Sequence, residues 1–592
     1  MERHKQAVAK IATAVRGFFD NKESYRIFHG STNSTRPRPG GGAAAVVDIS
    51  SLSHVVGINK AARTALVEPN VPMDRLVEST LRHGLVPPVV MEFPGITAGG
   101  GYAGTAGESS SFRHGFFNDT VNSVEMVLGN GDVVTASPAE REDLFRGAAG
   151  AVGTLGITTL MELRLVEARK FVRTTYHRTS SVAEAIEKVR AETRNPQNDY
   201  VDGILFSEHH GVVVTGTMTD DKPADAPVQT FSQRGDPWFY LHVQERTTTT
   251  TTTTTKTKDK QSAVTAVTDK TRSEKPSSSP SSTTTTTTDP SSPSSPAPVV
   301  DYIPLAEYLF RYDRAGFWVG AQGWTYFRHV PFNSFTRRLL NDFMHTRMMY
   351  RALHASGESA RFVVQDLALP YARAHEFITY TVDHFNIWPL WLCPLKQTLP
   401  PTFHPYTGEV VASDDDDNNN NNITTTSTST TTAAAVASNT TSSSSSTQHA
   451  AVPAAVPADM LNIGLWGWGP ADHDDFVREN RALEDTLVAL GGRKWLYAHT
   501  YYDHDEFWRV YRDNRDWYAA LRRKYHADTL PTVHDKVRVD AAAARADRAR
   551  WKQSLKSRWP LGGLYGLWQA VRSRDYLLHR NAAWQYKPEK EK

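Results

Sequence analysis

The sequence predicts an α+β protein with two folded units. Strand-like and helix-like stretches alternate over residues 20–168, and the turns between them are rich in glycine. From residue 169 the order changes to a strand, an amphipathic helix and two more strands. Strongly aromatic stretches follow, and two low-complexity tracts interrupt them. These observations indicate a glycine-rich α+β unit followed by a second α+β unit that carries inserts.

The composition of the chain argues against nucleic-acid binding, internal disulfides and a membrane-spanning segment. The 592 residues include 66 Lys and Arg against 64 Asp and Glu, so no global charge favours nucleic acid. Cys393 is the single cysteine, which excludes an internal disulfide and a cysteine-based metal site and predicts a reducing, intracellular compartment. The opening MERHKQAVAKIATAVRGFF predicts an amphipathic helix rather than a signal peptide, and no apolar run reaches the roughly 18 residues that would cross a bilayer.

The predicted elements of the first unit follow in chain order. A strand at Tyr25–Phe28 precedes AAAVVDISSLSHVVGI, which predicts a strand and a short helix. ARTALVEPNVPMDRLVESTLRHG predicts a strand and an amphipathic helix with Leu76, Thr80 and Leu81 on one side. VNSVEMVLGNGDVVTAS predicts a hairpin, Asp143 opens a helix, and TTLMELRLV predicts a strand.

The stretch Pro94–Gly115, PGITAGGGYAGTAGESSSFRHG, is built for close approach to a ligand. Glycine loses more entropy on folding than other residues, so this density of glycine indicates backbone N–H groups turned towards an anion. It has neither the Gly-Lys-Ser/Thr of a P-loop nor the strand-then-GxGxxG spacing of a Rossmann turn. A second candidate anion loop runs from His29 to Arg36, where a strand ends in glycine and hydroxyl residues; a plain polar turn is the alternative.

The order of these segments resembles the FAD-binding domain of the vanillyl-alcohol-oxidase, or p-cresol-methylhydroxylase (PCMH), type of flavoprotein. The resemblance rests on four pieces in order: Gly30 to Thr35, Thr97 to Gly100, Gly131-Asp132 and Gly153 to Ile157. It implies non-covalent FAD, because Asn33 stands where covalent members carry histidine. The FAD-contacting residues that it implies are Gly30, Ser31, Thr32, Asn33, Ser34, Thr97, Ala98, Gly99, Gly100, Gly101, Gly104, Thr105, Gly107, Glu108, Ser109, Gly153, Gly156 and Ile157.

Further motifs resemble one family, the Δ24-sterol reductases of the 24-dehydrocholesterol reductase and DWARF1-like group. They are TAGGGYAGTAGESSS, Tyr200 to Gly203, Val214 to Asp220, Pro237 to Phe239, Tyr302 to Leu305, Trp391 to Pro394, Leu496 to Ala498 with Tyr501, and Glu506 to Trp508. The similarity covers roughly residues 25–245, 300–400 and 460–540. It implies a two-subdomain PCMH-type FAD-binding domain, an α+β substrate cap, and reduction of a sterol side-chain double bond with NADPH. The low-complexity inserts that interrupt the cap are predicted to be disordered from their composition, and they depart from the family pattern.

The chemistry of that reaction needs an acid, because an isolated alkene has no carbonyl to accept hydride directly. A proton must reach C24 before or together with hydride transfer from reduced FAD to C25. Glu92, Tyr497 and Tyr501 are the candidate catalytic residues, and Glu108 is a further candidate acid. A salt-bridge or capping role for Glu92, loop ordering for Glu108 and core hydrogen bonding for the tyrosines are the structural alternatives.

Other residues give weaker signals. His114, His209 and His210 form no metal spacing with acidic partners, so no metal is predicted, and Cys393 is expected to be a buried hydrophobe. Residues 539–592 mix Trp551, Leu555, Trp559, Leu564, Leu567 and Trp568 with Lys552, Lys556, Arg558, Arg572 and Arg574. This mixture suits an anionic membrane surface, with packing on the cap as the alternative.

The predicted organisation is a helix at 1–19, the FAD-binding domain at 20–168, cap segments at 169–246, 300–412 and 453–538, inserts at 247–299 and 413–452, and a basic aromatic tail at 539–592. The protein is expected in the cytosol or peripherally on the endoplasmic reticulum. Two other functions remain open: an FAD oxidase or dehydrogenase of an alcohol or small lipophile, and a non-catalytic binding protein.

Overall fold

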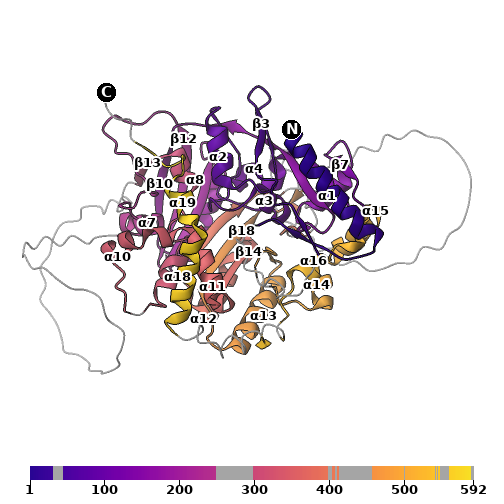
Figure 1. The fold of residues 1–592 in the computed structure, drawn as a ribbon. Helices are drawn as coiled ribbons and strands as arrows, with labels where there is room; N and C mark the ends of the chain where they lie inside the picture. Colours follow the sequence, from indigo (N-terminus) through magenta and orange to yellow (C-terminus); the bar gives the residue numbers. More distant parts are fainter. Residues whose placement is uncertain are drawn as a thin grey trace, which may run out of the picture.

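The computed structural model describes residues 1–30, 45–248, 298–327, 329–397, 403–406, 410–411, 456–498, 500–540, 542, 545–546 and 559–587 (Figure 1). The loop residues Ser31 to Ser34, most of both low-complexity tracts and most of the predicted basic helix at 541–559 lie outside this description. All structural statements here concern the described residues. They confirm the α+β class, since two large sheets are flanked by helices.

The first large sheet belongs to the glycine-rich unit. Its five strands are antiparallel and lie in the order β3-β4-β8-β6-β7. Helix α1 packs Val8, Ile11 and Val15 against Val127 and Ile157 of this sheet. The strands are β3 (Val55–Asn59), β4 (Thr64–Val67), β6 (Val121–Val127), β7 (Val133–Ala136) and β8 (Ile157–Arg164). The helices of this unit are α1 (Glu2–Asp20), α2 (Met73–Leu81), α3 (Ala98–Gly104), α4 (Ser111–His114), η1 (Phe117–Thr120) and α5 (Glu142–Ala148).

Two small sheets complete this part of the chain. Strands β1 (Arg26–Phe28) and β2 (Val46–Asp48) pair in parallel, and β5 (Leu85–Val86) pairs antiparallel with β9 (Val166–Glu167). The β1–β2 pair brings the start of the first candidate anion loop beside Ser50, which lies 3.6 Å from the position of a Cβ on Gly30.

The second large sheet has eight antiparallel strands in the order β13-β10-β12-β11-β15-β18-β14-β19. Its strands come from three stretches of sequence that the low-complexity tracts separate. They are β10 (Phe171–Thr179), β11 (Tyr200–Ser207), β12 (His210–Thr219), β13 (Val299–Pro304), β14 (Phe362–Pro370), β15 (Leu390–Leu395), β18 (Met460–Trp468) and β19 (Arg493–Lys494). Strands β16 (Val410–Val411) and β17 (Val456–Pro457) form a separate pair.

The two faces of this sheet contact different neighbours. Leu390 and Leu392 of β15 join a core with helices α6 (Val182–Thr193), α12 (Tyr371–Phe385) and α13 (His473–Ala489). Figure 1 shows α12 and α13 together below β14 and β18. Trp391 and Cys393, the alternate residues of β15, belong instead to the aromatic core shared with the glycine-rich unit. This second face therefore carries the side chains that reach the candidate site.

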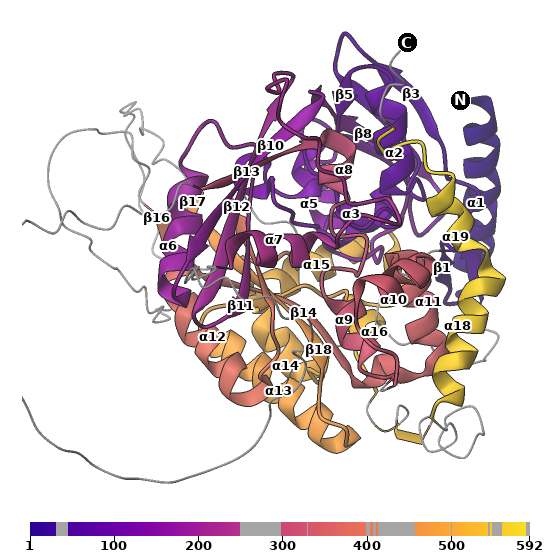
Figure 2. The ribbon, with the colours of Figure 1, turned by 90° about the vertical axis from the view of Figure 1, so that its left-hand side faces the viewer.

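The remaining helices surround the second sheet. They are α7 (Phe239–Thr247), α8 (Leu305–Leu309), α9 (Val319–Trp324), α10 (Ser334–Leu339), η2 (Asn341–Met344), α11 (Thr346–Ser356), η3 (Glu358–Arg361), α14 (His504–Val510), α15 (Arg512–Lys524), η4 (Ala527–Thr529), α16 (Val533–Val537), α18 (Leu561–Ser573) and α19 (Asp575–Arg580). Figure 2 shows α18 and α19 running along one side of the molecule, next to α11. None of the helices in the described ranges is long and apolar enough to cross a bilayer.

Most predicted elements are confirmed, with one correction. The β6–β7 hairpin, helix α5 and the β10-α6-β11-β12 series match the predictions. The short helix predicted after β2 is wrong, because residues 50–54 form a turn that leads into β3. There the backbone of Leu52 bonds to Ile49 and accepts from Asn70, which holds the turn in place of a helical ladder.

The glycine stretch also has more regular structure than its composition suggests. Residues Ala98–Gly104 form helix α3, and the Thr97 side chain caps it by accepting a hydrogen bond from the backbone of Gly100 at 3.2 Å. Thr105 ends the helix in the left-handed conformation.

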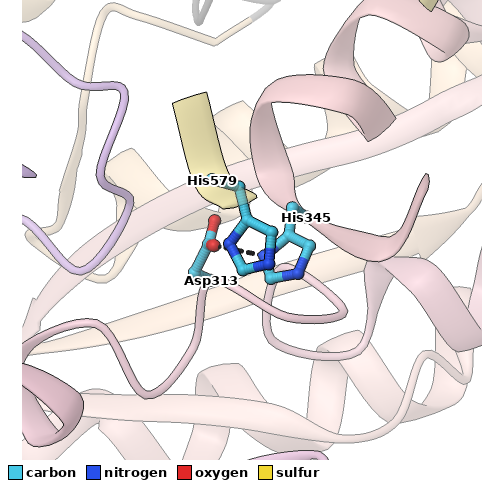
Figure 3. Close-up of side chains that lie close together, drawn as sticks. All are labelled: Asp313, His345 and His579. Carbon is cyan, nitrogen blue, oxygen red and sulfur yellow. Dashed lines mark hydrogen bonds and ion pairs between the residues drawn. The ribbon is translucent and has the colours of Figure 1, made fainter. Parts of the chain in front are cut away.

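The C-terminal segment is anchored to the second unit by Asp313, His345 and His579 (Figure 3). His345 Nδ1 lies 2.6 Å from Asp313 Oδ2, and the His345 and His579 rings stack with centroids 3.2 Å apart. Their potential ligand atoms lie within 4.8 Å of one another. The stacked rings and the His345–Asp313 hydrogen bond together join the C-terminal segment to the second unit.

Burial and neighbouring charges shift the pKa values of His579 and Asp313. Burial, with the His345 ring as a smaller cause, lowers the pKa of His579 to about 3. Burial alone would raise the pKa of Asp313, but His345 and His579 outweigh it and hold that pKa below its usual range. Between pH 6.5 and 3 the unfolded chain therefore binds a proton at residue 579 that the folded chain does not.

We predict that this anchor makes the fold sensitive to acid. The free energy of unfolding should fall by up to about 1.4 kcal/mol per pH unit through His579 as the pH drops below about 6.5. Replacing it as His579→Asn should lower stability at pH 7 and give a shallower decline between pH 6.5 and 5. Thermal unfolding of both proteins across this range measures the difference, and equal slopes would contradict the assignment.

Candidate active site

A cavity of about 350 Å³ lies between the glycine-rich unit and the second sheet. Helix α3 and the residues that follow it form one wall, and strands β14, β15 and β18 contribute side chains to the opposite wall. The lining residues among the FAD-contacting candidates are Thr97, Gly99, Gly100, Gly101, Gly104, Thr105, Gly107, Glu108, Gly153, Gly156 and Ile157.

The glycines of this wall have two distinct roles. A Cβ on Gly99 would lie 2.7 Å from Pro69 Cβ, and one on Gly101 would lie 2.5 Å from Met91 Cε. Gly99 requires glycine because a Cβ would also meet the Pro69 backbone, whereas a Cβ on Gly101 would require the Met91 side chain to move. A Cβ on Gly104 would meet no atom within 4 Å. That part of the wall leaves bare backbone open to the cavity.

One end of the cavity reaches the first candidate anion loop. Ile27, His29, Gly153 and Lys536 line it, and Lys536 Nζ lies 3.4 Å from the position of a Cβ on Gly153. A lysine ammonium beside glycine backbone is suited to a phosphate group. Lys536 also donates a hydrogen bond to the Val152 carbonyl, which fixes its position.

The other end is aromatic. It is lined by Phe317, Trp391 and Trp466. The ring centroid of Phe317 lies 4.4 Å from that of Trp466 and 5.1 Å from that of Trp391. Tyr350 of α11 also lines this end, and its ring centroid lies 6.1 Å from that of Phe93. Aromatic faces exclude water and attract cationic charge.

Two glutamates form a hydrogen-bonded pair on the cavity wall. Glu92 and Glu108 are both buried and both line the cavity. Burial raises the pKa of Glu92 to about 7, although its hydrogen bond with Glu108 and the charge of Arg311 oppose the shift. Burial and the adjacent Glu92 raise the pKa of Glu108 well above its usual value. The pair therefore retains a proton at neutral pH.

Arg311 contacts Glu92 of this pair, but its closer ion pair is with Asp202. Its Nη2 lies 3.4 Å from Glu92 Oε1 and 2.9 Å from Asp202 Oδ2, and its side chain is 1% exposed. Asp202 Oδ2 also accepts hydrogen bonds from Tyr312 at 2.7 Å and from the Trp391 indole at 3.1 Å. Because Asp202 takes the shorter contact, Arg311 leaves Glu92 only partly compensated.

A partly buried acid lies across the cavity. Asp366 accepts a short hydrogen bond from the Tyr497 hydroxyl and another from Asn462 at 2.9 Å. Burial raises the pKa of Asp366 to about 6 despite these bonds. Burial, followed by the charge of Asp366, raises the pKa of Tyr497 well above its usual value. Tyr497 therefore keeps its proton as a hydrogen-bond donor.

The remaining candidates lie in different places. Ala98 and Ser109 are buried behind the wall and do not line the cavity, while Gly30 is exposed at the start of its loop. Tyr501 packs in the core on the far face of the second sheet, so its hydroxyl does not line the cavity. Ser31, Thr32, Asn33 and Ser34 lie outside the described residues. Cys393 is buried, and burial raises its thiol pKa well above the usual value.

Sequence patterns did not single out several residues of the site. Asp366, Asn462 and Arg311 lie in predicted apolar or aromatic stretches, where a lone polar residue was the available signal. His404 is fully buried, and neither ring nitrogen has a hydrogen-bond partner among the described residues. It lies against Phe116, with ring centroids 3.9 Å apart, next to the cavity-lining Phe403.

Comparisons with known proteins agree with this geometry. Residues 6–137 match the FAD binding domain family. The human Delta(24)-sterol reductase is 24% identical over 497 residues, which cover 82% of this chain and 76% of the human protein. The Arabidopsis thaliana Delta(24)-sterol reductase is 24% identical over 517 residues, covering 83% of this chain and 76% of the relative. The chain is a homologue of the Delta(24)-sterol reductases.

A match outside these reductases covers a smaller part of the chain. Cytokinin dehydrogenase 4 of Oryza sativa subsp. japonica is 33% identical over 164 residues, or 27% of this chain and 30% of that protein. The Delta(24)-sterol reductase similarity covers 82% of the chain, so it includes the second unit as well. The match to cytokinin dehydrogenase 4 is too short to cover both units.

The cavity fits FAD on structural grounds. Bare backbone at Gly104 and the cation Lys536 beside Gly153 are features that a large anionic ligand would satisfy. The residues that would hold the isoalloxazine and ribityl parts are those of α3 and its following loop, and Lys536 would face the pyrophosphate.

The two glycine roles give a testable contrast. Gly99→Ala should destabilise the protein by about 1–3 kcal/mol, because the new methyl group meets Pro69 side chain and backbone. Gly104→Ala should leave thermal stability within about 1 kcal/mol of the wild type, because no atom opposes the methyl group and alanine favours the helix. It should nevertheless lower the flavin content, since the methyl group enters the cavity.

Thermal unfolding and the ratio of flavin to protein absorbance measure the two effects. Full flavin content in Gly104→Ala would place the cofactor away from this wall.

Proposed function

We propose that this protein is an FAD-dependent oxidoreductase that reduces the Δ24 double bond of a sterol side chain, with NADPH as the electron donor. The observation that carries the proposal is the buried Glu92–Glu108 pair, which retains a proton beside an aromatic cavity that fits FAD. Homologues named Delta(24)-sterol reductase over four fifths of the chain support the substrate class. A location in the cytosol or on the surface of the endoplasmic reticulum is part of the proposal.

The proton donor follows from the order of the pKa values in the pair. Glu108 holds its proton more strongly than Glu92 because two buried carboxylates in contact cannot both ionise. Glu108 therefore donates to C24, and Glu92 orients it through their hydrogen bond. FAD, when bound and reduced, supplies the hydride equivalent that completes the reduction at C25.

The aromatic end of the cavity protects the charge that develops on the substrate. Phe317, Trp391 and Trp466 exclude water, which would otherwise trap a tertiary cation as an alcohol. Their ring faces stabilise positive charge on C25. The anionic form of Asp366, held by Tyr497 and Asn462, adds an electrostatic contribution from the opposite wall.

An FAD-dependent dehydrogenase of an alcohol or other small lipophile is the alternative function. The 33% identity with cytokinin dehydrogenase 4 over 164 residues supports it, because that relative is named a dehydrogenase of a different substrate class. Such a reaction needs a base, for which the anionic form of Asp366 is available, but it does not use the protonated Glu92–Glu108 pair that a reduction requires. The reductase is therefore the better supported function.

An anaerobic flavin titration tests the proposal. NADPH should bleach the flavin band of the purified protein, and desmosterol should restore it. A flavin that NADPH leaves oxidised would overturn the assignment of the donor, and a reduced flavin that oxygen but not desmosterol reoxidises would favour an FAD oxidase of an alcohol or other small lipophile.

The acid assignment predicts a selective defect. Glu108→Gln should slow flavin reoxidation by desmosterol by about 10²-fold or more, because the amide cannot supply the proton, while reduction by NADPH should be little changed. Glu187→Gln, an exposed position on α6, is the matched control. Stopped-flow absorbance separates the two half-reactions, and an equal slowing of both would point to loss of structure instead.

The same pair predicts the pH dependence. Glu92 has a raised pKa of about 7, so it is protonated below that pH and becomes an anion above it. The anion strengthens the hold of the pair on its remaining proton, so the reoxidation rate should fall as the pH rises through about 7. In Glu92→Gln this inflection should disappear; its persistence would assign the titration to another group, such as Asp366.

A further inference from the structure

Helix α18 has an inverted distribution of side chains. The residues facing the protein are small, namely Gly562, Gly563, Gly566 and Ala570. The large apolar residues Leu561, Leu564, Trp568 and Val571 are exposed, with exposed fractions between 44% and 53%. Their spacing of three and four residues places them along one side of the helix. A helix that only completes a core would show the opposite distribution.

The small inner face allows α18 to approach the protein closely. A Cβ on Gly566 would lie 2.5 Å from the Ala352 carbonyl of α11, and one on Gly563 would lie 2.5 Å from the Tyr326 ring. Both views of the molecule show α18 beside α11. The helix is thus fixed in position with its apolar row outward, and the anchor at His579 holds the segment that follows it.

The charges around the row indicate what covers it. Helix α18 contains no acidic residue, and between residues 559 and 587 the basic residues Arg572, Arg574, Arg580 and Lys587 outnumber Asp575. Arg580 is paired with Asp342, which leaves an excess of positive charge at the other three. Asp575 is itself paired with Arg351. Arg572 lies 5.5 Å from the centre of the Trp568 ring. Tryptophan and leucine flanked by arginine suit the boundary between acyl chains and anionic headgroups.

We infer that α18 docks on an anionic lipid bilayer and brings the α11 side of the cavity to its surface. The supporting link is α11, which packs against α18 and contributes Tyr350 to the cavity lining. A lipophilic substrate dissolved in the bilayer then enters next to the aromatic end of the site. This delivery role rests on the proposed function, whereas the membrane contact stands on α18 alone.

Vesicle flotation of the full-length protein tests the contact. The wild type should float with vesicles of phosphatidylcholine and phosphatidylserine, and less with phosphatidylcholine alone or in high salt. The double variant Leu564→Ser, Trp568→Ser should lower the vesicle-bound fraction by about tenfold or more. Val133→Ser, an exposed apolar position on β7, is the matched control and should float as the wild type does.

The same samples show whether the double variant is folded. They also show whether a second copy of the chain, rather than a bilayer, covers the exposed row of α18. Flavin absorbance and thermal unfolding of the double variant should equal those of the wild type, because both substituted side chains are about half exposed. Equal flotation of the double variant and the wild type would overturn the inference. A wild type that stays in solution as a dimer, and becomes monomeric in the double variant, would assign the row to a second copy of this chain.

The delivery role has its own readout. The double variant should reduce desmosterol in detergent micelles at the wild-type rate and desmosterol in vesicles at about a tenth of that rate or less, in proportion to its lost binding. Normal vesicle turnover in the double variant would overturn delivery through α18. Absence of turnover by the wild type in both forms would reject the proposed function, while flotation would still decide the membrane contact.

Discussion

The arrangement of the site depends on an excess of buried carboxyl groups over buried positive charge. The buried Asp202, Glu92 and Glu108 and the partly buried Asp366 lie in one region, and Arg311 contacts the first two. Asp202 takes the closer contact with Arg311 and two further hydrogen bonds, so most of the positive charge of Arg311 compensates Asp202. The charge of the other acids is then costly, and their pKa values rise.

This imbalance connects the fold to chemistry. A buried acid with a full set of charged partners would be a structural ion pair and would hold no proton at neutral pH. The Glu92–Glu108 pair lacks such partners because Trp391 and Trp466 of the second sheet, with the nearby Phe317, line the cavity where another cation could have stood. The aromatic wall therefore raises the pKa of the acids and shields the reacting carbon from water.

The C-terminal segment illustrates how residues far apart in the chain become one structural unit. Asp313 and His345 lie in the second unit, and His579 comes from α19. Their contact fixes the segment that carries α18, and the glycines of α18 allow it to lie against α11. The exposed row of leucine and tryptophan is a consequence of this packing, because the narrow interface admits only small side chains.

Local pattern was sufficient for much of the fold and for one wall of the site. Alternation and turn residues predicted the β6–β7 hairpin and the β10-α6-β11-β12 series, because those signals lie within a few residues of each other. The same signals failed at residues 50–54, where contacts with Asn70 replace a helix. The domain boundaries and the roles of the site residues remain predictions.

The sequence by itself determined the α+β class, the glycine wall at residues 97–107 and Glu92 and Glu108 as candidate acids, since each depends on residue type and near neighbours. Only the tertiary structure decided that Glu92 and Glu108 form a pair, that Asp366 and Lys536 join the cavity, and that Tyr501 lies on the far face of the sheet. Proximity between distant segments and the loss of water around a carboxyl group arise only when the chain packs, and a local pattern encodes neither.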